Sequence, residues 1–154
     1  MTHLKEGDKA PEFSGVNQNG EKITLADYRG KKLILFFYPK DNTPTCTVEA
    51  CNLRDNYALL QERGFELLGV SADSERKHQN FINKYNLPFP LLSDRDHTVL
   101  NQFGVYGPKM MFGRLLSGIH RTTFVIDEQG VIEQVITNVK SKAHAAQILE
   151  SVEA

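Results

Sequence analysis

Cysteine is scarce in this sequence, with two residues in a chain of 154. Two cysteines cannot form a disulfide framework for a chain of this length, and a core of this size does not need one. A bond between them would therefore serve chemistry rather than scaffolding. The chain also lacks the run of about 18 apolar residues that a membrane-spanning helix requires, and its N-terminus lacks the apolar core of a signal peptide. We therefore expect a cytoplasmic protein with no membrane partner.

The chain also lacks an excess of charge of either sign. The formal net charge is -1, and the lysines and arginines are scattered rather than gathered in a basic run. Such a chain has no general electrostatic attraction for nucleic acid, which argues against a nucleic-acid partner. Its hydrophobic content of 40% and charged content of 24% are ordinary for a globular protein. The length predicts a single domain, 1–154, that buries about two thirds of its unfolded-chain surface.

The continuous apolar run 33–38 is typical of a strand that is buried on both faces, and residues 65–72 are predicted to form the next buried strand. Between them, residues 44–63 have a helical pattern, with Gly64 at the expected C-terminal cap. These three segments predict a βαβ unit with parallel strands and a right-handed connection.

The remaining segments continue the alternation of strands and helices. In chain order they predict an N-terminal hairpin at Asn19-Gly20, a helix that Asp73 or Ser74 caps and that ends before Pro88, a strand at 89–94, a short helix at 97–104, a hairpin of 122–127 with 131–139, and a last helix from Ser141. We therefore expect an α/β fold with a mixed central sheet and helices on both faces.

Cys46 follows a helix-start signal. A helix that begins near Thr43 has that residue at its N-cap, Pro44 at the first helical position and Cys46 two residues further on. A cysteine in the first turn meets free backbone N–H groups and the positive end of the helix dipole, which favour a thiolate. The alternative is a buried, inert cysteine that packs like a small apolar residue.

Cys51 is the fifth residue after Cys46. On an α-helix this spacing gives a rotation of about 500° and a rise of about 7.5 Å, so the two Cα atoms lie about 8 to 9 Å apart. A disulfide usually requires a Cα separation below about 7 Å. The two cysteines can therefore bond only if the helix between them unwinds. In an intact helix, Cys51 is expected to pack on the core face with Val48.

The stretch 39–46, "PKDNTPTC", matches the peroxiredoxin pattern of Pro, three residues, Thr, two residues and Cys. The chain also contains the segments "GDKAPEF", "TCTVEACNLRD", "LLSD" and "HRTTFVID", in the order that is typical of one class of that family. Over essentially its whole length the chain resembles the Bcp/PrxQ class of peroxiredoxins, whose atypical two-cysteine members carry a second cysteine at this spacing. The resemblance implies a thioredoxin-like fold with an N-terminal β-hairpin.

The resemblance also implies a function, a thiol-dependent peroxidase for hydrogen peroxide and organic hydroperoxides, and a role for each matching residue. Cys46 would attack the peroxide and become a sulfenic acid. Cys51 would resolve it as an intramolecular disulfide, and a thioredoxin-type dithiol would reduce that bond. Thr43 and Arg121 would donate hydrogen bonds at the reacting oxygen, and Pro39 would shield the thiolate. No cofactor or metal is implied, and the intramolecular pairing favours a monomer.

Other candidates are weaker. His120 lies near Arg121 in the sequence, but a strand-end role is more common for such a residue; Glu49 is either a solvated helix carboxylate or a structural part of the site. The segment 108–113, "PKMMFG", reads as a loop that either lines an apolar entry for organic hydroperoxides or packs on the core. No grouping of His, Cys and carboxylate residues has zinc-ligand spacing, which argues against a metal carrier. The main alternative is a non-enzymatic redox sensor, in which unwinding of the helix on oxidation controls a protein partner.

Overall fold

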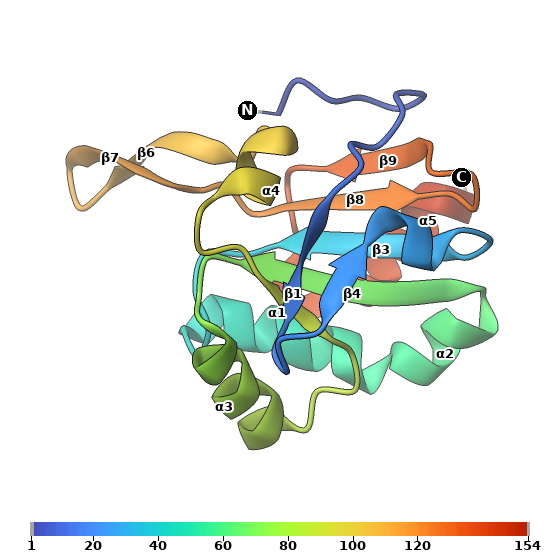
Figure 1. Ribbon diagram of the computed structural model, residues 1–154, viewed down its shortest axis with the longest axis horizontal. Coiled ribbons are helices and arrows are strands. Elements are labelled where there is room, and N and C mark those ends of the chain that lie inside the picture. Colours follow the sequence, from blue (N-terminus) through green and yellow to red (C-terminus); the bar gives the residue numbers. More distant parts are fainter. Residues whose placement is uncertain (1, 154) are drawn as a thin grey trace.

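The computed structural model describes residues 2–153, which form a seven-stranded mixed sheet with helices on both faces (Figure 1). The strand order is β2-β1-β5-β4-β3-β8-β9, and a separate two-stranded sheet is formed by β6 and β7. The strands are β1 (Ser14–Asn17), β2 (Lys22–Thr24), β3 (Lys32–Phe37), β4 (Phe65–Ser71), β5 (Leu91–Ser93), β6 (Tyr106–Met111), β7 (Arg114–Ile119), β8 (Thr122–Ile126) and β9 (Ile132–Ile136).

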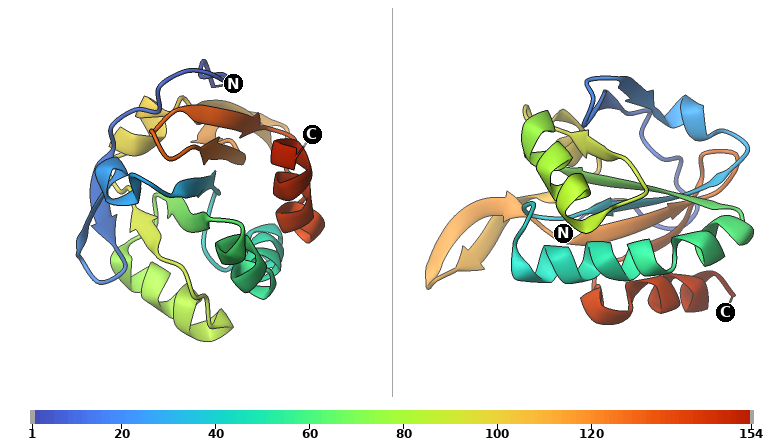
Figure 2. Two further views of the ribbon diagram at one scale, coloured as in Figure 1. Left: turned by 90° about the vertical axis from the view of Figure 1, so that its right-hand side faces the viewer. Right: turned by 90° about the horizontal axis from the view of Figure 1, so that it is seen from below.

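The helices divide between the two faces of the sheet. One apolar cluster joins the sheet to α1, α2, α3 and α5, and the other joins it to α4 and to the N-terminal segment. Figure 2 shows α1, α2 and α5 on the same side of the sheet. The helices are α1 (Pro44–Asp55), α2 (Tyr57–Glu62), α3 (Glu75–Tyr85), α4 (Thr98–Gln102) and α5 (His144–Glu153), with 3₁₀ turns η1 (Leu25–Tyr28) and η2 (Ser141–Ala143). None of these helices is long and apolar enough to cross a membrane.

Strand β3 lies in the interior of the sheet, between one parallel and one antiparallel neighbour. It pairs in parallel with β4 and antiparallel with β8. Alternate β3 residues enter opposite clusters: Leu35 packs with the N-terminal face and Phe36 with the α1 face. The continuous apolar run therefore predicted a doubly buried strand correctly, and the βαβ unit and both predicted hairpins are confirmed.

The single helix predicted for residues 44–63 is wrong, because it is interrupted at Asn56. The Asn56 side-chain Nδ2 donates to the Asn52 carbonyl at 2.8 Å. That carbonyl is the acceptor that the Asn56 backbone N–H would use in a continuous helix, and the N–H instead points to the Leu53 carbonyl at 3.3 Å. The result is two shorter helices, α1 and α2. The last helix likewise starts with a 3₁₀ turn at Ser141 before α5 begins.

The loop predicted for residues 108–113 is also wrong, since this segment belongs to the β6–β7 hairpin. Its turn residues Phe112 and Gly113 have φ values of 54° and 74°. A two-residue hairpin turn of this kind needs positive φ at both positions, which Gly adopts easily and Phe rarely does. The hairpin projects from the body of the molecule in Figure 1, and Phe112 at its tip is 97% exposed. This segment therefore does not pack on the core.

Candidate active site

The N-terminus of α1 presents Cys46 as expected. Thr43 is the N-cap residue in an extended conformation, and Pro44 occupies the first helical position. The Thr47 N–H donates to the Thr43 carbonyl at 2.9 Å and is the first helical backbone bond. The N–H of Cys46 precedes this bond, so it has no acceptor within the helix. The Cys46 side chain is 2% exposed and carries a free thiol.

Arg121 reaches Cys46 from a distant part of the chain. Strand β3 pairs with β8 such that Phe37 lies opposite Thr122, which places the end of β3 and the start of β8 at the same edge of the sheet. Helix α1 follows β3 at this edge, and Arg121 immediately precedes β8. The Arg121 Nη2 lies 3.2 Å from the Cys46 Sγ, although the two residues are 75 positions apart. The fold therefore brings these two predicted residues together.

The second nitrogen of the guanidinium contacts Glu49, one turn beyond Cys46 on α1. Arg121 Nη1 donates to Glu49 Oε1 at 2.6 Å, and the Glu49 side chain is fully buried. Burial raises the pKa of Glu49 to about 7, although Arg121 acts in the opposite direction. Burial alone would lower the pKa of Arg121, but Glu49 and Cys46 outweigh it, so that this pKa is raised. Arg121 is thus a cation between two groups that can each be an anion.

The interpretation of Glu49 as a solvated helix carboxylate is therefore wrong. Sequence reasoning also missed His144 at the start of α5, whose Nε2 lies 3.6 Å from Glu49 Oε2. His144 is buried, and burial lowers its pKa to about 4. A histidine at a helix start, 95 positions from Glu49 in the sequence, gives no local signal that would connect the two.

Cys51 lies on the same intact helix as Cys46 and is half-buried, with a free thiol. The expectation that it shares a core face with Val48 is wrong, because Val48 is 39% exposed. Between the cysteines, Glu49 and Ala50 point to the interior. The helix is wound, so that its own geometry keeps the two sulfurs apart.

Thr43 and Pro39 lie in the segment that leads into α1. The Thr43 hydroxyl donates to the Lys40 carbonyl at 2.9 Å, which fixes the turn before the helix. Pro39 is half-buried and follows Tyr38, the residue after β3. Both residues lie at the sheet edge where α1 begins.

A surface cleft of about 250 Å³ borders Arg121. Lys109 of β6 and His120, which directly follows β7, line it together with Thr122 and Thr137. The His120 Nε2 donates to the Pro108 carbonyl at 2.9 Å, and the Lys109 ammonium donates to the Ile119 carbonyl at 2.9 Å. Both side chains therefore tie the hairpin strands together beside the cleft.

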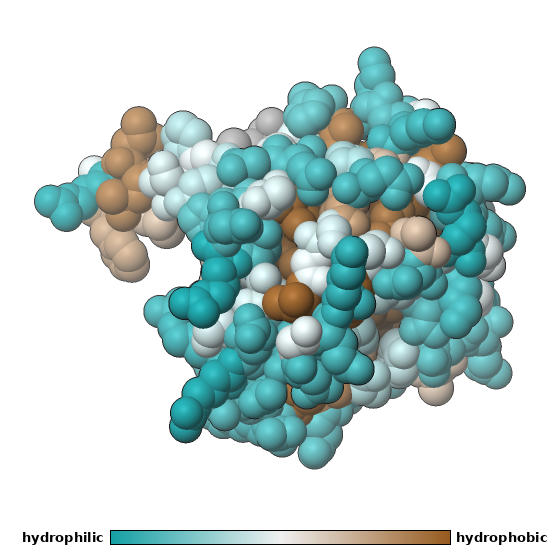
Figure 3. Space-filling view, viewed as in Figure 1, coloured by the Kyte–Doolittle hydropathy of each residue, from teal (hydrophilic) through white to brown (hydrophobic). Residues whose placement is uncertain are grey.

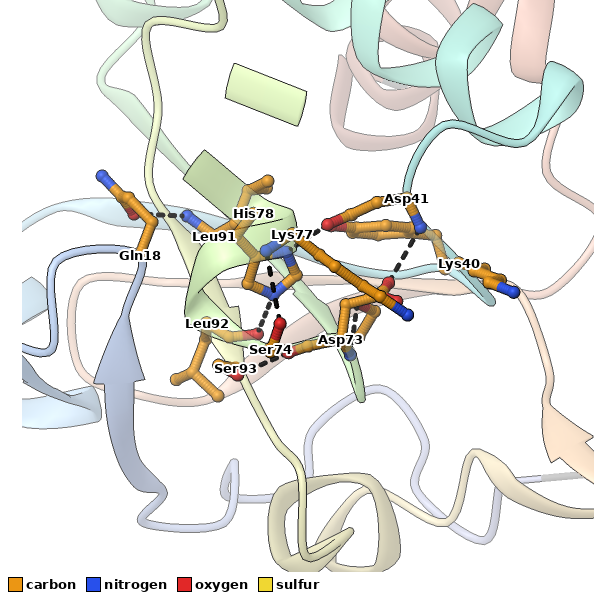
Figure 4. Close-up of polar contacts among 12 residues, drawn as sticks. Gln18, Lys40, Asp41, Asp73, Ser74, Lys77, His78, Leu91, Leu92 and Ser93 are labelled. Atoms are coloured by element: carbon orange, nitrogen blue, oxygen red, sulfur yellow. Dashed lines mark hydrogen bonds and ion pairs between the residues drawn. The ribbon is translucent and has the colours of Figure 1, made fainter. Parts of the chain in front are cut away.

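A buried polar cluster also includes a residue of the segment that precedes α1. Asp41, Asp73 and His78 point toward one another and are buried (Figure 4). His78 Nδ1 lies 2.7 Å from Asp41 Oδ2, while its Nε2 donates to the Leu92 carbonyl at 3.0 Å. The Asp41 N–H donates to Asp73 Oδ2 at 2.8 Å.

The spacing argument found no metal-ligand set, yet these three residues offer atoms within 4.8 Å of one another. Five of their six side-chain polar atoms are already engaged. The Tyr38 hydroxyl donates to the other Asp41 oxygen at 2.6 Å, and the Ser71 hydroxyl donates to Asp73 Oδ2 at 2.8 Å. The cluster therefore anchors the segment before α1 to β4, α3 and β5.

Residues 6–135 match the model of the AhpC/TSA family. The chain is 47% identical over 144 residues to peroxiredoxin Bcp of Escherichia coli, with 94% of this chain and 92% of the relative covered. A cysteine-to-serine mutant of PrxQ from Xylella fastidiosa has a TM-score of 0.91 and 31% identity, covering 99% and 98% of the two chains. The bacterioferritin comigratory protein of Xanthomonas campestris, described for its alkyl peroxide reduction activity, has a TM-score of 0.87 and 32% identity, covering 99% and 98%.

These similarities define the class of protein. The chain has a thioredoxin-like fold and is an oxidoreductase that acts as a thiol peroxidase. It belongs to the AhpC/TSA family and, within it, to the Bcp/PrxQ peroxiredoxins.

Proposed function

We propose that this protein reduces hydroperoxides through Cys46 and is regenerated through Cys51. The proposal rests on one observation above all, the 3.2 Å contact of Arg121 Nη2 with the Cys46 Sγ at the first turn of α1. The guanidinium and the free N–H groups of the helix start stabilise negative charge on the sulfur. Hydrogen bonds to an ionised group are the stronger kind, so this arrangement favours the nucleophilic thiolate.

In the first step the Cys46 thiolate attacks the terminal oxygen of R–O–OH. An S–O bond forms and the O–O bond breaks, so that the sulfur becomes a sulfenic acid and the leaving alkoxide becomes an alcohol after it gains a proton. Arg121 and the Cys46 N–H act as donors to the oxygens on which charge develops. Thr43 holds the helix start through its bond to the Lys40 carbonyl, and Pro39 limits the access of water.

In the second step Cys51 attacks the sulfenic sulfur, and water leaves as the Cys46–Cys51 disulfide forms. Because five residues on a helix keep the Cα atoms about 8 to 9 Å apart, α1 must unwind locally. The break at Asn56 limits the number of residues that must change conformation. A thioredoxin-type dithiol then reduces the disulfide by thiol–disulfide exchange.

Hydrogen peroxide and organic hydroperoxides are both proposed as substrates. The cleft beside Arg121 gives peroxides an approach to the site, and the Xanthomonas campestris relative is described for alkyl peroxide reduction. We further propose that the protein acts as a monomer, because the proposed disulfide pairs cysteines of one chain, and that it works in the cytoplasm.

The function is tested with Cys46→Ser and Cys51→Ser in a peroxidase assay coupled to thioredoxin. Cys46→Ser should lose consumption of both peroxide types. Cys51→Ser should still oxidise Cys46 once, accumulate a sulfenic acid and lose most of its coupled turnover. Full activity of Cys46→Ser would exclude Cys46 as the nucleophile, and unchanged turnover of Cys51→Ser would indicate a one-cysteine cycle. Slow, substoichiometric peroxide consumption with strong partner binding after oxidation would instead indicate a redox sensor.

A further inference from the structure

The Glu49 carboxyl group has two oxygens in different situations. Oε1 accepts from Arg121 Nη1 at 2.6 Å, whereas Oε2 is buried and has no hydrogen-bond partner among residues 2–153. A buried carboxylate oxygen without a donor is costly, because it has lost its water and gained nothing in return. A proton on Oε2 removes the larger part of this cost, which is the burial of a negative charge. The arrangement of donors therefore favours a neutral Glu49 whose Oε1 still binds Arg121.

His144 faces the orphaned oxygen in its neutral form. Its Nδ1 lies 2.9 Å from Gln147 Oε1, and the orientation of the Gln147 amide is fixed because that oxygen also accepts from the Lys140 N–H and its Nε2 donates to the Asn138 carbonyl. Nδ1 therefore carries the hydrogen. The other nitrogen, Nε2, accepts from the Thr123 hydroxyl at 2.7 Å. A neutral His144 thus offers no hydrogen-bond donor to Glu49 Oε2.

The titration behaviour of the two groups agrees with this geometry. The pKa of Glu49 is raised to about 7 by burial, and the pKa of His144 is lowered to about 4 by burial. Below about pH 7, a single proton shared by this pair therefore resides mainly on Glu49.

Two further ionisable groups, Cys46 and Lys109, lie beside Arg121, the residue that binds Glu49. Cys46 shares helix α1 with Glu49 and contacts the second guanidinium nitrogen. Lys109 of β6 lines the cleft beside Arg121, and its pKa is lowered by burial and by the guanidinium. Arg121 thus has two potential counter-anions in one buried site, the Cys46 thiolate and the Glu49 carboxylate. Both cannot be ionised without a net negative charge away from water.

We propose that Glu49 is a charge-balancing residue of the peroxidase, which holds a proton on Oε2 while Cys46 is a thiolate and releases it when the thiolate is consumed. This inference rests on the proposed role of Cys46. Arg121 then keeps one counter-anion in both states, the sulfur before oxidation and the carboxylate after it. Glu49 acts through Arg121 and is a positioning residue, not a group that touches the peroxide.

The proton balance makes the proposal measurable. Conversion of a thiolate and R–O–OH to a sulfenic acid and an alcohol oxidises the sulfur by two electrons, reduces the peroxide and consumes one proton. If Glu49 releases one proton in the same event, the protein as a whole takes up none from solution. With glutamine at position 49, whose amide oxygen can still accept from Arg121, one proton must come from solution.

The experiment compares Cys51→Ser with Cys51→Ser/Glu49→Gln, so that the reaction stops at the sulfenic acid. A pH-indicator dye in weak buffer at pH 6 follows proton uptake after a single equivalent of hydrogen peroxide, and ultraviolet absorbance verifies that Cys46 is ionised beforehand. We expect close to zero protons per oxidised Cys46 with Glu49 present and close to one in its absence. At pH 8, which is above the pKa of Glu49, both variants should take up one proton per oxidised Cys46. Cys51→Ser/Glu62→Gln is the matched control, since Glu62 is exposed on α2, and it should behave like Cys51→Ser.

A difference infrared spectrum gives a second readout in the same variants. The carbonyl stretch of a buried protonated carboxyl group should be present in the reduced Cys51→Ser protein, disappear on oxidation and be missing in the Glu49→Gln variant. Equal proton uptake in the two variants at pH 6, or a carboxyl band unaffected by oxidation, would overturn the inference while the role of Cys46 stands. If peroxide does not oxidise Cys46 at all, the proposed function fails and this inference fails with it.

Discussion

At the scale of single residues, the site depends on one guanidinium that serves two partners. Arg121 Nη1 binds Glu49 and Nη2 contacts Cys46. A lysine carries the same charge as a point at the end of a flexible chain, so it cannot hold both partners in this fork geometry. The arginine at this position is therefore expected to be required for its shape as well as for its charge.

We expect Arg121→Lys to slow the oxidation of Cys46 by about 100-fold, comparable to the loss of one preorganised donor at a reacting oxygen. The rate is measured by stopped-flow mixing of the reduced protein with peroxide. Arg76→Lys is the control, since Arg76 is exposed on α3, and its rate should equal that of the unmodified protein. An equal rate for Arg121→Lys would show that charge alone suffices.

The buried pair of Glu49 and His144 also predicts a pH dependence of stability. The folded-state pKa of Glu49 is raised from 4.5 to about 7. The stability that Glu49 contributes to the folded protein is therefore fully present below pH 4.5 and is lost as the pH rises to 7. The pKa of His144 is lowered from 6.5 to about 4, so its contribution is lost as the pH falls from 6.5 to 4. Between about pH 4.5 and 6.5 the two groups change the free energy of unfolding in opposite directions, so that their effects cancel.

Glu49→Gln should remove the pH dependence of stability that arises from Glu49 and leave only the one that arises from His144. Relative to the unmodified protein, the variant should lose about 3 kcal/mol of unfolding free energy between pH 6.5 and 4.5, because it lacks the proton that folding binds at Glu49. Urea unfolding at the two pH values measures this difference, and Glu62→Gln should show none. Parallel pH profiles would mean that Glu49 is already ionised in the folded protein at pH 5.

At the scale of elements, helix α1 is held at one side by a contact with η2 and α5. The Asn52 side chain donates to the Lys142 carbonyl at 3.0 Å and accepts from the Ala145 N–H at 2.9 Å. Asn52 is next to Cys51, so these bonds resist the unwinding that the Cys46–Cys51 disulfide requires. The same helix is interrupted at Asn56, which favours unwinding. The two asparagines therefore act in opposite directions.

Asn52→Ala should accelerate disulfide formation by about fivefold, which corresponds to about 1 kcal/mol from the lost hydrogen bonds. Asn56→Ala should slow it, because alanine favours a continuous helix across the break. Both rates are obtained by quenching the reaction after a peroxide pulse and counting free thiols. Similar rates in all three proteins would place the slow step outside the opening of α1.

The same elements show what sequence could and could not predict. The apolar run of β3 and the Thr-Pro-Thr-Cys start of α1 are local patterns, so both were predicted correctly. The break at Asn56 depends on one side chain that competes for a backbone carbonyl, and no periodicity reveals it. The hairpin β6–β7 was missed because Phe112 occupies a turn position that usually requires Gly or Asn.

Contacts between distant segments were beyond the reach of local patterns. The sequence gives no reason to pair Glu49 with His144, or Asp41 with His78. Arg121 was expected at the site only because the chain resembles a family that places an arginine there. Its position becomes physically clear with the strand order, in which β8 lies beside β3.

At the scale of the whole molecule, the proposed cycle requires one part of the site to move and leaves another part in place. Cys46, Glu49 and Cys51 lie on α1, whereas Arg121 belongs to the sheet edge and the segment before α1 is anchored by Asp41. The apolar side chains of the projecting hairpin, brown at the left of Figure 3, lie apart from both parts. Oxidation should therefore change α1 without opening the sheet.

Hydrogen exchange of the reduced and disulfide forms tests this division. Amides of residues 44–55 should exchange faster after oxidation, while those of β3, β4 and β8 keep their protection. Amide 41, which donates to Asp73, should be unaffected as well. Loss of protection across the sheet would indicate a global rather than a local opening.

The anchoring of Asp41 by His78 and Asp73 has a consequence for the return half of the cycle. In the proposed cycle, reduction of the disulfide frees the unwound part of α1, and we expect the segment before α1 to have kept its shape during oxidation. Refolding of α1 is then a local search over a few residues, and helix formation in peptides takes about 0.1–1 μs. Recovery should thus follow the arrival of the reductant with no conformational delay, so that the protein regains its starting geometry after every turnover.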